Sequence, residues 1–266
     1  MSNQIKRVLN WRPSLPDHRD FLYEKIAKPI QLPPMVDLRP LCSPILDQGD
    51  LGSCSGHAMA GMVEFLELNE IRAKAPGPQE YVLGQFAPVS RMFIYYVERS
   101  LEGTVSQDAG VTTLRDGCKA VQQVGVPREL LWAYEDSLLA VKPSAPAYAE
   151  AAKHKVSAYY ALNGLTQMKE CLAHGFPFCM GISDYDSFMS DAVAASGIVP
   201  MPAASESIQG GHAVDAVGYD DSKQWFIMRN SWGTGWGAAG YFYLPYQYVQ
   251  ALADDFFTLR KVAAGI

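Results

Sequence analysis

The spacing of apolar residues divides the chain into a helical first part and a strand-rich second part. From Ala58 to Ile71, apolar side chains recur every three to four positions, which predicts an amphipathic helix that begins at or just after Ser53. Three further stretches have helical character, and we expect helices at 90–100, 112–124 and 166–174. Strand character predicts extended segments at 156–162, 176–182, 212–219 and 224–230.

This order of elements favours an α+β fold with segregated layers, because an interleaved parallel α/β protein would alternate helices and strands. We therefore expect a helical lobe at about 42–150 and a sheet lobe at about 151–266, with a cleft between them. The first 31 residues contain three prolines and no sustained period. We predict that this leader (residues 1–31) is an extended segment in front of a body at 32–266.

Composition and charge narrow the class of protein. Hydrophobic residues make up 48% of the chain and charged residues 19%, which is ordinary for a globular protein. The formal net charge of -6 and the lack of clustered Lys and Arg argue against a nucleic-acid surface. No signal-peptide apolar stretch and no membrane-spanning run is found. We expect no membrane contact and a protein that is cytoplasmic or exported without a Sec signal peptide.

The cysteines point to a reducing compartment. The chain has five, at scattered spacings and without a CxxC pair: Cys42, Cys54, Cys118, Cys171 and Cys179. This pattern argues against a structural zinc site and against a dense disulfide framework. We expect four of these residues to be packed thiols and Cys54 to carry chemistry. The histidines show no spacing that suggests a metal, so no metal or other cofactor is expected.

The segment 48–56, QGDLGSCSG, brings Cys54 to the start of the predicted helix through a glycine-containing turn. A thiol reacts as its thiolate, and the positive end of a helix together with an imidazolium lowers the pKa of a cysteine at this position. The backbone amide of Cys54 and the side-chain amide of Gln48 can donate to an oxyanion. Alternatively, Cys54 is a small buried hydrophobic residue, as most free cysteines are.

A second segment, 210–237, supplies a base. His212 opens one predicted strand and Asn230 closes the next, so a hairpin can bring the two side chains together. An acceptor on one ring nitrogen fixes the tautomer that presents the other nitrogen to sulfur, and Asn230 can supply it. Asp215 is a rival acceptor, but alternation along the strand points it to the opposite face from His212. Trp232 and Trp236 either cover the His–Asn bond or simply pack in the core.

Together these two segments resemble the papain family of cysteine peptidases (family C1). Gln48 and the Gly-Ser-Cys at 52–54 resemble the nucleophile block of the family. His-Ala-Val at 212–214 and Asn-Ser-Trp-Gly-Thr-Gly-Trp-Gly at 230–237 resemble its histidine and asparagine blocks. Three positions depart from the family pattern: Leu51 replaces a disulfide cysteine, Ser55 an aromatic residue and Gly211 an acidic residue. The short leader looks more like the bacterial branch of the family.

The resemblance implies a papain-like two-lobe fold, with a helical left lobe, an antiparallel β-barrel-like right lobe and the active site in the cleft. It implies peptide-bond hydrolysis through a Cys54 thioester, most simply by an endopeptidase with an apolar or aromatic preference before the scissile residue. The expected catalytic residues are Cys54, His212, Asn230 and Gln48. The expected substrate-binding residues are Gly52, Ser53, Ala109, Gly110, Gly211, Ala213 and Trp232. The expected partner is a peptide or protein substrate.

Several alternatives remain open at this stage. The leader either lies across the cleft and restrains activity or braces the body away from the site. The same machinery could pass its acyl group to an amine, as an acyl transferase or deamidase, or the chain could be a catalytically silent homologue that binds peptides. His57 lies one turn after Cys54, and packing explains it as well as a catalytic role does.

Overall fold

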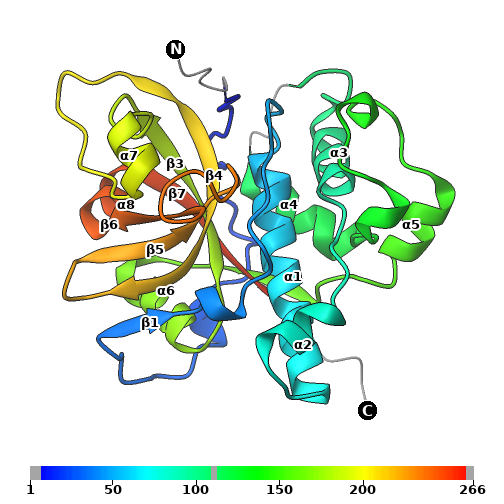
Figure 1. Ribbon diagram of the computed structural model, residues 1–266, viewed down its shortest axis with the longest axis horizontal. Coiled ribbons are helices and arrows are strands. Elements are labelled where there is room, and N and C mark those ends of the chain that lie inside the picture. Colours follow the sequence, from blue (N-terminus) through cyan, green and yellow to red (C-terminus); the bar gives the residue numbers. More distant parts are fainter. Residues whose placement is uncertain (1–6, 109–112, 262–266) are drawn as a thin grey trace.

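The computed structural model describes residues 7–108 and 113–261, and these form two lobes that meet along the helix α1 (Figure 1). The helical lobe contains α1 (Cys54–Lys74), α2 (Gln79–Gly84), α3 (Arg91–Glu102), α4 (Leu114–Lys119) and α5 (Ala145–Ala151). A π-helical turn, Ala120–Val124, continues α4. The predicted helices at 90–100 and 112–124 therefore correspond to α3 and to α4 with its π turn.

The long helix α1 is buried on nearly all sides from Cys54 to Leu68. It packs against α3 and α4 of its own lobe and against three strands of the other lobe, β3 (Phe178–Tyr185), β4 (Ile208–Asp220) and β7 (Ala253–Arg260). The predicted start of this helix is confirmed, but the prediction of an amphipathic helix is wrong for its first four turns. A helix enclosed by both lobes needs apolar or paired side chains all round, and only its last turns face solvent.

The sheet lobe is built on one antiparallel sheet. In the described residues its strands are β1 (Met35–Asp37), β2 (Ala158–Ala161), β3 (Phe178–Tyr185), β4 (Ile208–Asp220), β5 (Trp225–Arg229), β6 (Tyr241–Pro245) and β7 (Ala253–Arg260). They are ordered β2-β7-β3-β4-β5-β6, and β1 also pairs with β4. The four predicted strands correspond to β2, β3, β4 and β5. His212 lies inside β4 rather than at its start, because the strand begins four residues earlier at Ile208.

Three helices accompany the sheet: α6 (Gly164–Ala173), α7 (Asp191–Ser196) and α8 (Tyr246–Leu252). The first corresponds to the helix predicted at 166–174, whereas the short α7 and α8 carry too few periodic positions to be predicted. The ends of α7 have clear local causes. The hydroxyl of Ser190 accepts a hydrogen bond from the Val193 amide at the N-terminus, and Gly197 adopts a left-handed conformation at the C-terminus.

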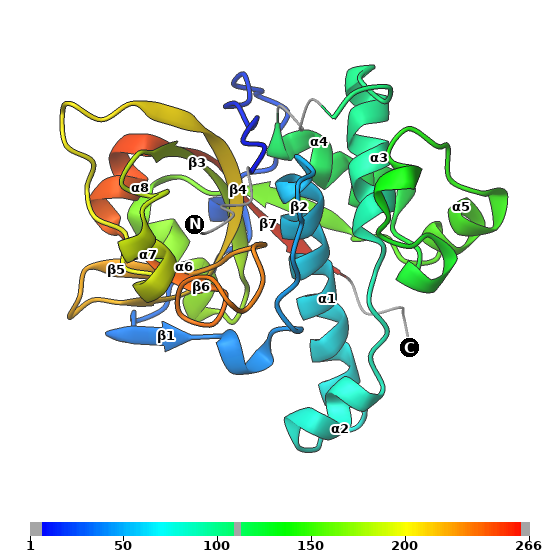
Figure 2. The same ribbon diagram turned by 45° about the horizontal axis from the view of Figure 1, so that its top comes forward.

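The described part of the leader, residues 7–31, has little regular structure but is anchored in the body. It runs between the sheet and α4, visible as the dark blue segment in Figure 2. Two of its aromatic side chains, Trp11 and Tyr23, are buried. Tyr23 belongs to the core of the sheet lobe, and its hydroxyl lies 2.9 Å from Nδ1 of His174. The prediction of an irregular segment is confirmed, but its aromatic anchors were not predicted.

None of the helices in the described residues is both long and apolar enough to cross a membrane.

Candidate active site

Cys54 is the first residue of α1, and its side chain is only 3% exposed. The residues before it form the turn that was predicted from Gly49 and Gly52, so the sulfur lies at the positive end of the helix. Cys54 packs in one apolar cluster with Ala213, on β4 of the opposite lobe, and the Ala213 backbone acts to lower the pKa of the thiol. The thiol of the helical lobe is thus in contact with the residue that follows His212.

His212 and Asn230 are joined by a hydrogen bond of 2.8 Å between Nε2 and Oδ1, and both side chains are buried. The Asn230 oxygen also accepts a bond of 2.8 Å from the Ser231 amide, so it is the oxygen and not the amide nitrogen that faces the ring. Nε2 of His212 therefore carries the proton. Nδ1 is buried without a hydrogen-bond partner among the described residues, so its lone pair is not engaged.

Asp215 lies on the face of β4 opposite to His212, as strand alternation predicts. It points toward α1 and Arg229, where a β carbon at Gly61 would contact its Oδ2 at 2.8 Å. The carboxyl group of Asp215 is buried, and desolvation raises its pKa well above the ordinary value. It makes no contact with the imidazole, so Asn230 and not Asp215 is the partner that the structure gives to His212.

Trp232 covers the imidazole of His212. The two rings are stacked, with centroids 4.8 Å apart and an interplanar angle of 24°. Trp236 packs edge-on against Trp232, and Phe188 contacts the rings of both tryptophans. Trp232 fulfils both of the roles considered from the sequence. It belongs to the core of the sheet lobe, and it is stacked on the His212 ring and so covers it.

Gln48 is fully buried beside Cys54 and is oriented from both lobes. Its Nε2 donates to the Leu51 carbonyl at 2.8 Å, and its Oε1 accepts from the Ser231 hydroxyl at 2.6 Å. One hydrogen of the Gln48 amide is therefore bonded within the turn, and the second remains available for another acceptor. The role of Ser231 was not predicted, since a serine between two motif residues carries no signal of its own in a single sequence.

Comparisons with known proteins agree with this geometry. The family model for papain family cysteine proteases matches residues 111–253. The chain belongs to the papain family of cysteine proteases. An uncharacterized peptidase C1-like protein of Acanthamoeba polyphaga mimivirus is 35% identical over 293 residues, covering 100% of this chain and 90% of that protein. The predicted family and the expected activity, a cysteine peptidase, are thereby confirmed.

Solved structures of papain-family proteases have the same fold as this chain. Xylellain, a cysteine protease from Xylella fastidiosa, is 35% identical over 96% of both chains, with a TM-score of 0.85. Digestive procathepsin L 3 of Tenebrio molitor is only 18% identical but has a TM-score of 0.67 over 94% of this chain and 76% of that chain. The predicted two-lobe fold is confirmed, and the likeness to xylellain agrees with the expected resemblance to bacterial members of the family.

The leader pairs with β4 next to His212. The Trp11 amide donates to the Gly211 carbonyl at 3.0 Å, and the Gly211 amide donates to the Leu9 carbonyl at 3.3 Å. The indole of Trp11 lies on Gly181, in space that a β carbon would fill. These contacts were missed because the leader has no periodicity. Glycines inside the strands, at 181 and 210–211, were the available signal of a close backbone approach.

Arg7 extends the contacts of the leader to the Trp232 ring. Its guanidinium lies 5.5 Å from the centre of the Trp232 ring and forms an ion pair of 2.7 Å with Asp47. Arg7 also donates to the carbonyl of Gly49 at 2.7 Å. The described leader therefore contacts the turn before Cys54 on one lobe and the cover of His212 on the other.

Burial shifts the pKa values of both Cys54 and His212. Desolvation raises the pKa of Cys54 to about 12, against smaller opposing contributions from backbone hydrogen bonds. Desolvation also lowers the pKa of His212 to about 4; the bond to Asn230 raises it and the Arg7 charge lowers it further. Burial therefore favours the neutral form of both groups and opposes the thiolate that the helix start favours. Helix position alone does not form the anion while the site excludes water.

The expected substrate-binding residues have different surroundings. Gly211 and Trp232 face the leader, and Ala213 is buried against Cys54. The Gly52 amide donates to both carboxylate oxygens of Asp108 at 3.1 Å, so this donor is engaged within the lobe. Ser53 is also turned inward, toward Tyr134. The remaining two expected residues, Ala109 and Gly110, lie outside the described residues.

The remaining histidines and cysteines fit packing roles. His57 is buried, with Nδ1 2.9 Å from the Ser53 carbonyl and Nε2 3.2 Å from Arg91, so both ring nitrogens are engaged away from Cys54. All five cysteines are buried and unpaired, which confirms the packed thiols expected at the four positions other than Cys54. A search of the described ranges gives no cluster of His, Cys, Asp and Glu able to hold a metal ion.

Proposed function

We propose that this papain-family protease is a cysteine endopeptidase in which Cys54 is the nucleophile, His212 the general base and acid, and Asn230 the group that orients the imidazole. One arrangement carries the proposal. Cys54, at the start of α1, packs with Ala213, the residue that follows His212, and the His212 ring is held through Nε2 while Nδ1 has no hydrogen-bond partner among the described residues. Such a pair can exchange a proton between sulfur and ring.

Acylation begins when the Cys54 proton moves to Nδ1 of His212 and the sulfur attacks the carbonyl carbon of the scissile peptide bond. The π electrons of the carbonyl move to oxygen. The resulting oxyanion accepts hydrogen bonds from the Cys54 amide and from the second hydrogen of the Gln48 amide. The intermediate then collapses, the C–N bond breaks, and His212 gives its proton to the leaving amine.

Deacylation reverses these roles with water. His212 removes a proton from water as it attacks the Cys54 thioester, and the same donors stabilise the second oxyanion. Collapse expels the sulfur and releases the new carboxyl group. All proton transfers pass through one ring, so the orientation of that ring by Asn230 and its cover by Trp232 matter in both halves of the reaction.

For substrate preference, we propose that an apolar or aromatic side chain binds where Trp11 lies in the covered state. This indole is buried against Gly181, and it shares an apolar cluster with Cys54 and Ala213. Its Nε1 donates to Asp255 at 3.2 Å, so the pocket ends in a carboxyl group. The space left by small residues and the aromatic occupant both support the preference expected from the sequence.

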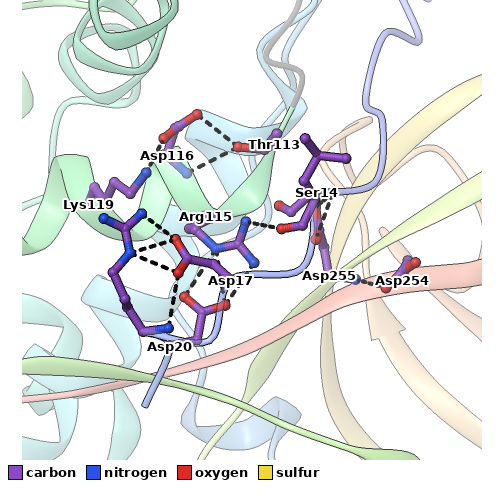
Figure 3. A network of polar contacts seen from close by, with 11 residues as sticks. Ser14, Asp17, Asp20, Thr113, Arg115, Asp116, Lys119, Asp254 and Asp255 are labelled. Carbon is purple, nitrogen blue, oxygen red and sulfur yellow. Dashed lines mark hydrogen bonds and ion pairs between the residues drawn. The ribbon is translucent and has the colours of Figure 1, made fainter. Parts of the chain in front are cut away.

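For regulation, we propose that the leader restrains the enzyme until it is moved. Figure 3 displays the anchors that support this proposal. Asp255 of β7 accepts hydrogen bonds from the amide of Ser14 at 3.0 and 3.1 Å, on the sheet lobe. Arg115 of α4 pairs with Asp20 at 2.7 Å and donates to the carbonyl of Leu15 at 2.8 Å, on the helical lobe. A segment held by both lobes closes the cleft between them.

We also propose the division of the chain given above, with the leader at 1–31, a peptidase domain at 32–266 and lobes at about 42–150 and 151–266. The pairing of β1, at Met35–Asp37, with β4 supports a body that starts shortly before this strand. The burial of Tyr23 means that the leader is packed into the domain rather than attached to it by a free linker. Point variants of the full chain are therefore better probes than deletion.

The test is cleavage of a peptide library by the full chain and by its Trp11→Ala variant, each beside its Cys54→Ala counterpart. We expect cleavage at internal peptide bonds where an apolar or aromatic residue stands one position before the residue that supplies the scissile carbonyl. We expect no cleavage by the Cys54→Ala counterparts. An added amine such as glycine amide separates the classes of reaction. Hydrolysis gives free carboxyl ends, whereas an acyl transferase gives amide products. Cleavage that persists in the Cys54→Ala chain would reject the proposed hydrolysis. So would a reaction whose products are all amides formed with glycine amide.

A further inference from the structure

The turn that precedes Cys54, residues 47–53, must keep a fixed conformation for the proposed oxyanion site to form. No disulfide bond fixes this conformation. The turn carries Gln48, and it ends at the amide of Cys54. Leu51 offers no thiol for a disulfide, and Cys54 and the other four cysteines are free. The turn must therefore be positioned by noncovalent contacts, and the described residues show where these are.

One phenol hydroxyl joins the two ends of this turn. Tyr134 lies between two short 3-10 helices of the helical lobe, Glu129–Leu131 and Asp136–Leu138. Its hydroxyl donates to the Gln48 carbonyl at 2.8 Å and lies 2.5 Å from the Ser53 hydroxyl. Because the single phenol proton goes to Gln48, the proton of the second bond comes from Ser53. Residues 48 and 53 are thus held to the same oxygen atom.

Neighbouring groups determine which atom donates in each hydrogen bond around Ser53 and also fix the Tyr134 ring. Arg91 donates to Nε2 of His57 at 3.2 Å, so Nδ1 carries the proton and donates to the Ser53 carbonyl at 2.9 Å. Glu129 balances the Arg91 charge through an ion pair of 2.5 Å. The Arg91 guanidinium also lies 4.5 Å from the centre of the Tyr134 ring. Tyr134 is thereby fixed through its ring as well as through its hydroxyl.

Burial favours the neutral forms of His57 and Tyr134, the two uncharged titratable groups of this network. Burial lowers the pKa of His57 to about 3, with the Arg91 charge acting in the same direction. Burial also raises the pKa of Tyr134 above its ordinary value, and the hydrogen bond with Ser53 and the Arg91 charge oppose this shift. The neutral forms are the ones that the hydrogen-bond directions above require.

We propose that Tyr134 is a positioning residue of the oxyanion site, which acts on the reaction through Gln48. By fixing the Gln48 carbonyl relative to Ser53, the Tyr134 hydroxyl sets how far the Gln48 amide stands from the first turn of α1. Gln48 itself is oriented at its other end by the Ser231 hydroxyl, on the sheet lobe. The contact with Tyr134 thus comes from one lobe and the contact with Ser231 from the other. This inference rests on the proposed peptidase function.

The test compares Tyr134→Phe with the parent in the full chain carrying Trp11→Ala, so that the leader does not mask activity. We expect kcat for a small peptide amide to fall about tenfold while KM changes less than about threefold. Alkylation of Cys54 by iodoacetamide needs the thiol but no oxyanion donor, so its rate and pH profile should not change. The Tyr148→Phe variant is a matched control, since Tyr148 in α5 packs on Phe93 away from the turn.

Two further variants keep the proposal open to refutation. Ser53→Ala removes the other hydroxyl of the pair and should reproduce the loss in kcat. In a Gln48→Ala background, Tyr134→Phe should cost less than about twofold, because its effect passes through Gln48. Unchanged kcat in Tyr134→Phe, an equal loss of alkylation, or a full tenfold loss without Gln48 would each overturn the inference. Failure of the parent itself to react at Cys54 would instead reject the proposed function.

Discussion

Trp11 of the leader and Gly181 of β3 occupy one site, because the indole fills the volume that a β carbon at residue 181 would need. The same indole donates through Nε1 to Asp255, 244 residues away along the chain. This packing places Trp11 in the same buried cluster as Cys54, the proposed nucleophile. Substitution of Trp11 is therefore the most direct way to release the proposed restraint.

Replacing Trp11 by alanine should increase peptide hydrolysis by the full chain about tenfold or more. The substitution removes the buried indole and its bond to Asp255, while the anchors at Asp20 and Tyr23 remain in place. Steady-state rates with a fluorogenic peptide amide measure the effect. Phe21→Ala is the control, since Phe21 is 62% exposed and should leave the rate unchanged. Equal rates for Trp11→Ala and the parent would assign the leader a bracing role instead.

The pH dependence of Cys54 alkylation should differ between the covered and uncovered site. In the full chain, a pKa of about 12 for Cys54 predicts slow labelling that rises toward high pH, because only the thiolate reacts. Trp11→Ala admits water, and Arg7→Ala removes a cation that lowers the pKa of His212. Both changes should favour the thiolate–imidazolium pair and move the midpoint toward neutral pH by about two units or more.

Arg12→Ala, on an exposed leader residue, is the control for this profile. The rates are read as the mass increase of Cys54 after iodoacetamide, from pH 4 to about pH 10, with the four buried thiols as internal references. A midpoint near the ordinary cysteine value of about 8.5 in every variant would mean that the leader does not tune the pair.

Asn230→Ala should lower kcat about 10- to 100-fold with a smaller change in KM. The variant loses the 2.8 Å bond that holds Nε2 of His212, so the ring no longer presents Nδ1 in one orientation. Asp215→Asn is the matched comparison, because Asp215 lies on the opposite face of β4. A larger loss in Asp215→Asn than in Asn230→Ala would reverse the choice of orienting residue.

Glu98 should make the fold less stable as pH rises. This carboxyl group on α3 is fully buried and accepts a bond of 2.9 Å from the Ser55 hydroxyl. Burial raises its pKa from 4.5 to about 8, despite the opposing effect of Ser55. Between these two values the folded protein binds a proton that the unfolded chain lacks, so the contribution to stability is complete below 4.5 and lost as pH rises through 8.

Denaturant unfolding of Glu98→Gln measures this contribution. The variant should weaken the pH dependence of the free energy of unfolding by roughly 1 kcal/mol per pH unit between pH 5 and pH 8. The exposed Glu80→Gln serves as control. Parallel pH profiles for the parent and Glu98→Gln would show that Glu98 is ionised in the folded protein.

The sequence predicted the parts of the site that depend on local pattern. Helical spacing after Ser53 located the start of α1 and so the position of Cys54, and strand alternation separated His212 from Asp215. Motif residues that lie in one hairpin, such as His212 and Asn230, are brought together by β4 and β5 pairing alone. These features need no knowledge of the opposite lobe.

What the sequence could not predict depends on packing between distant segments. Trp11 and Asp255 meet only because the leader lies over β7, and Tyr134 reaches Gln48 across 86 residues of chain. The pKa of Cys54 also depends on such packing. A helix start lowers the pKa of a thiol, whereas burial raises it, and the extent of burial is a property of the folded whole.

The central claim is that the reaction passes through a thioester on Cys54. The most direct measurement is the intact mass, followed by peptide mapping, of the Trp11→Ala chain quenched with acid during turnover of a peptide ester. We predict an added acyl group on the peptide that contains Cys54, absent from the Cys54→Ala counterpart and lost on incubation at neutral pH. An acyl group on another residue, or turnover that continues at the same rate in the Cys54→Ala chain, would contradict the mechanism.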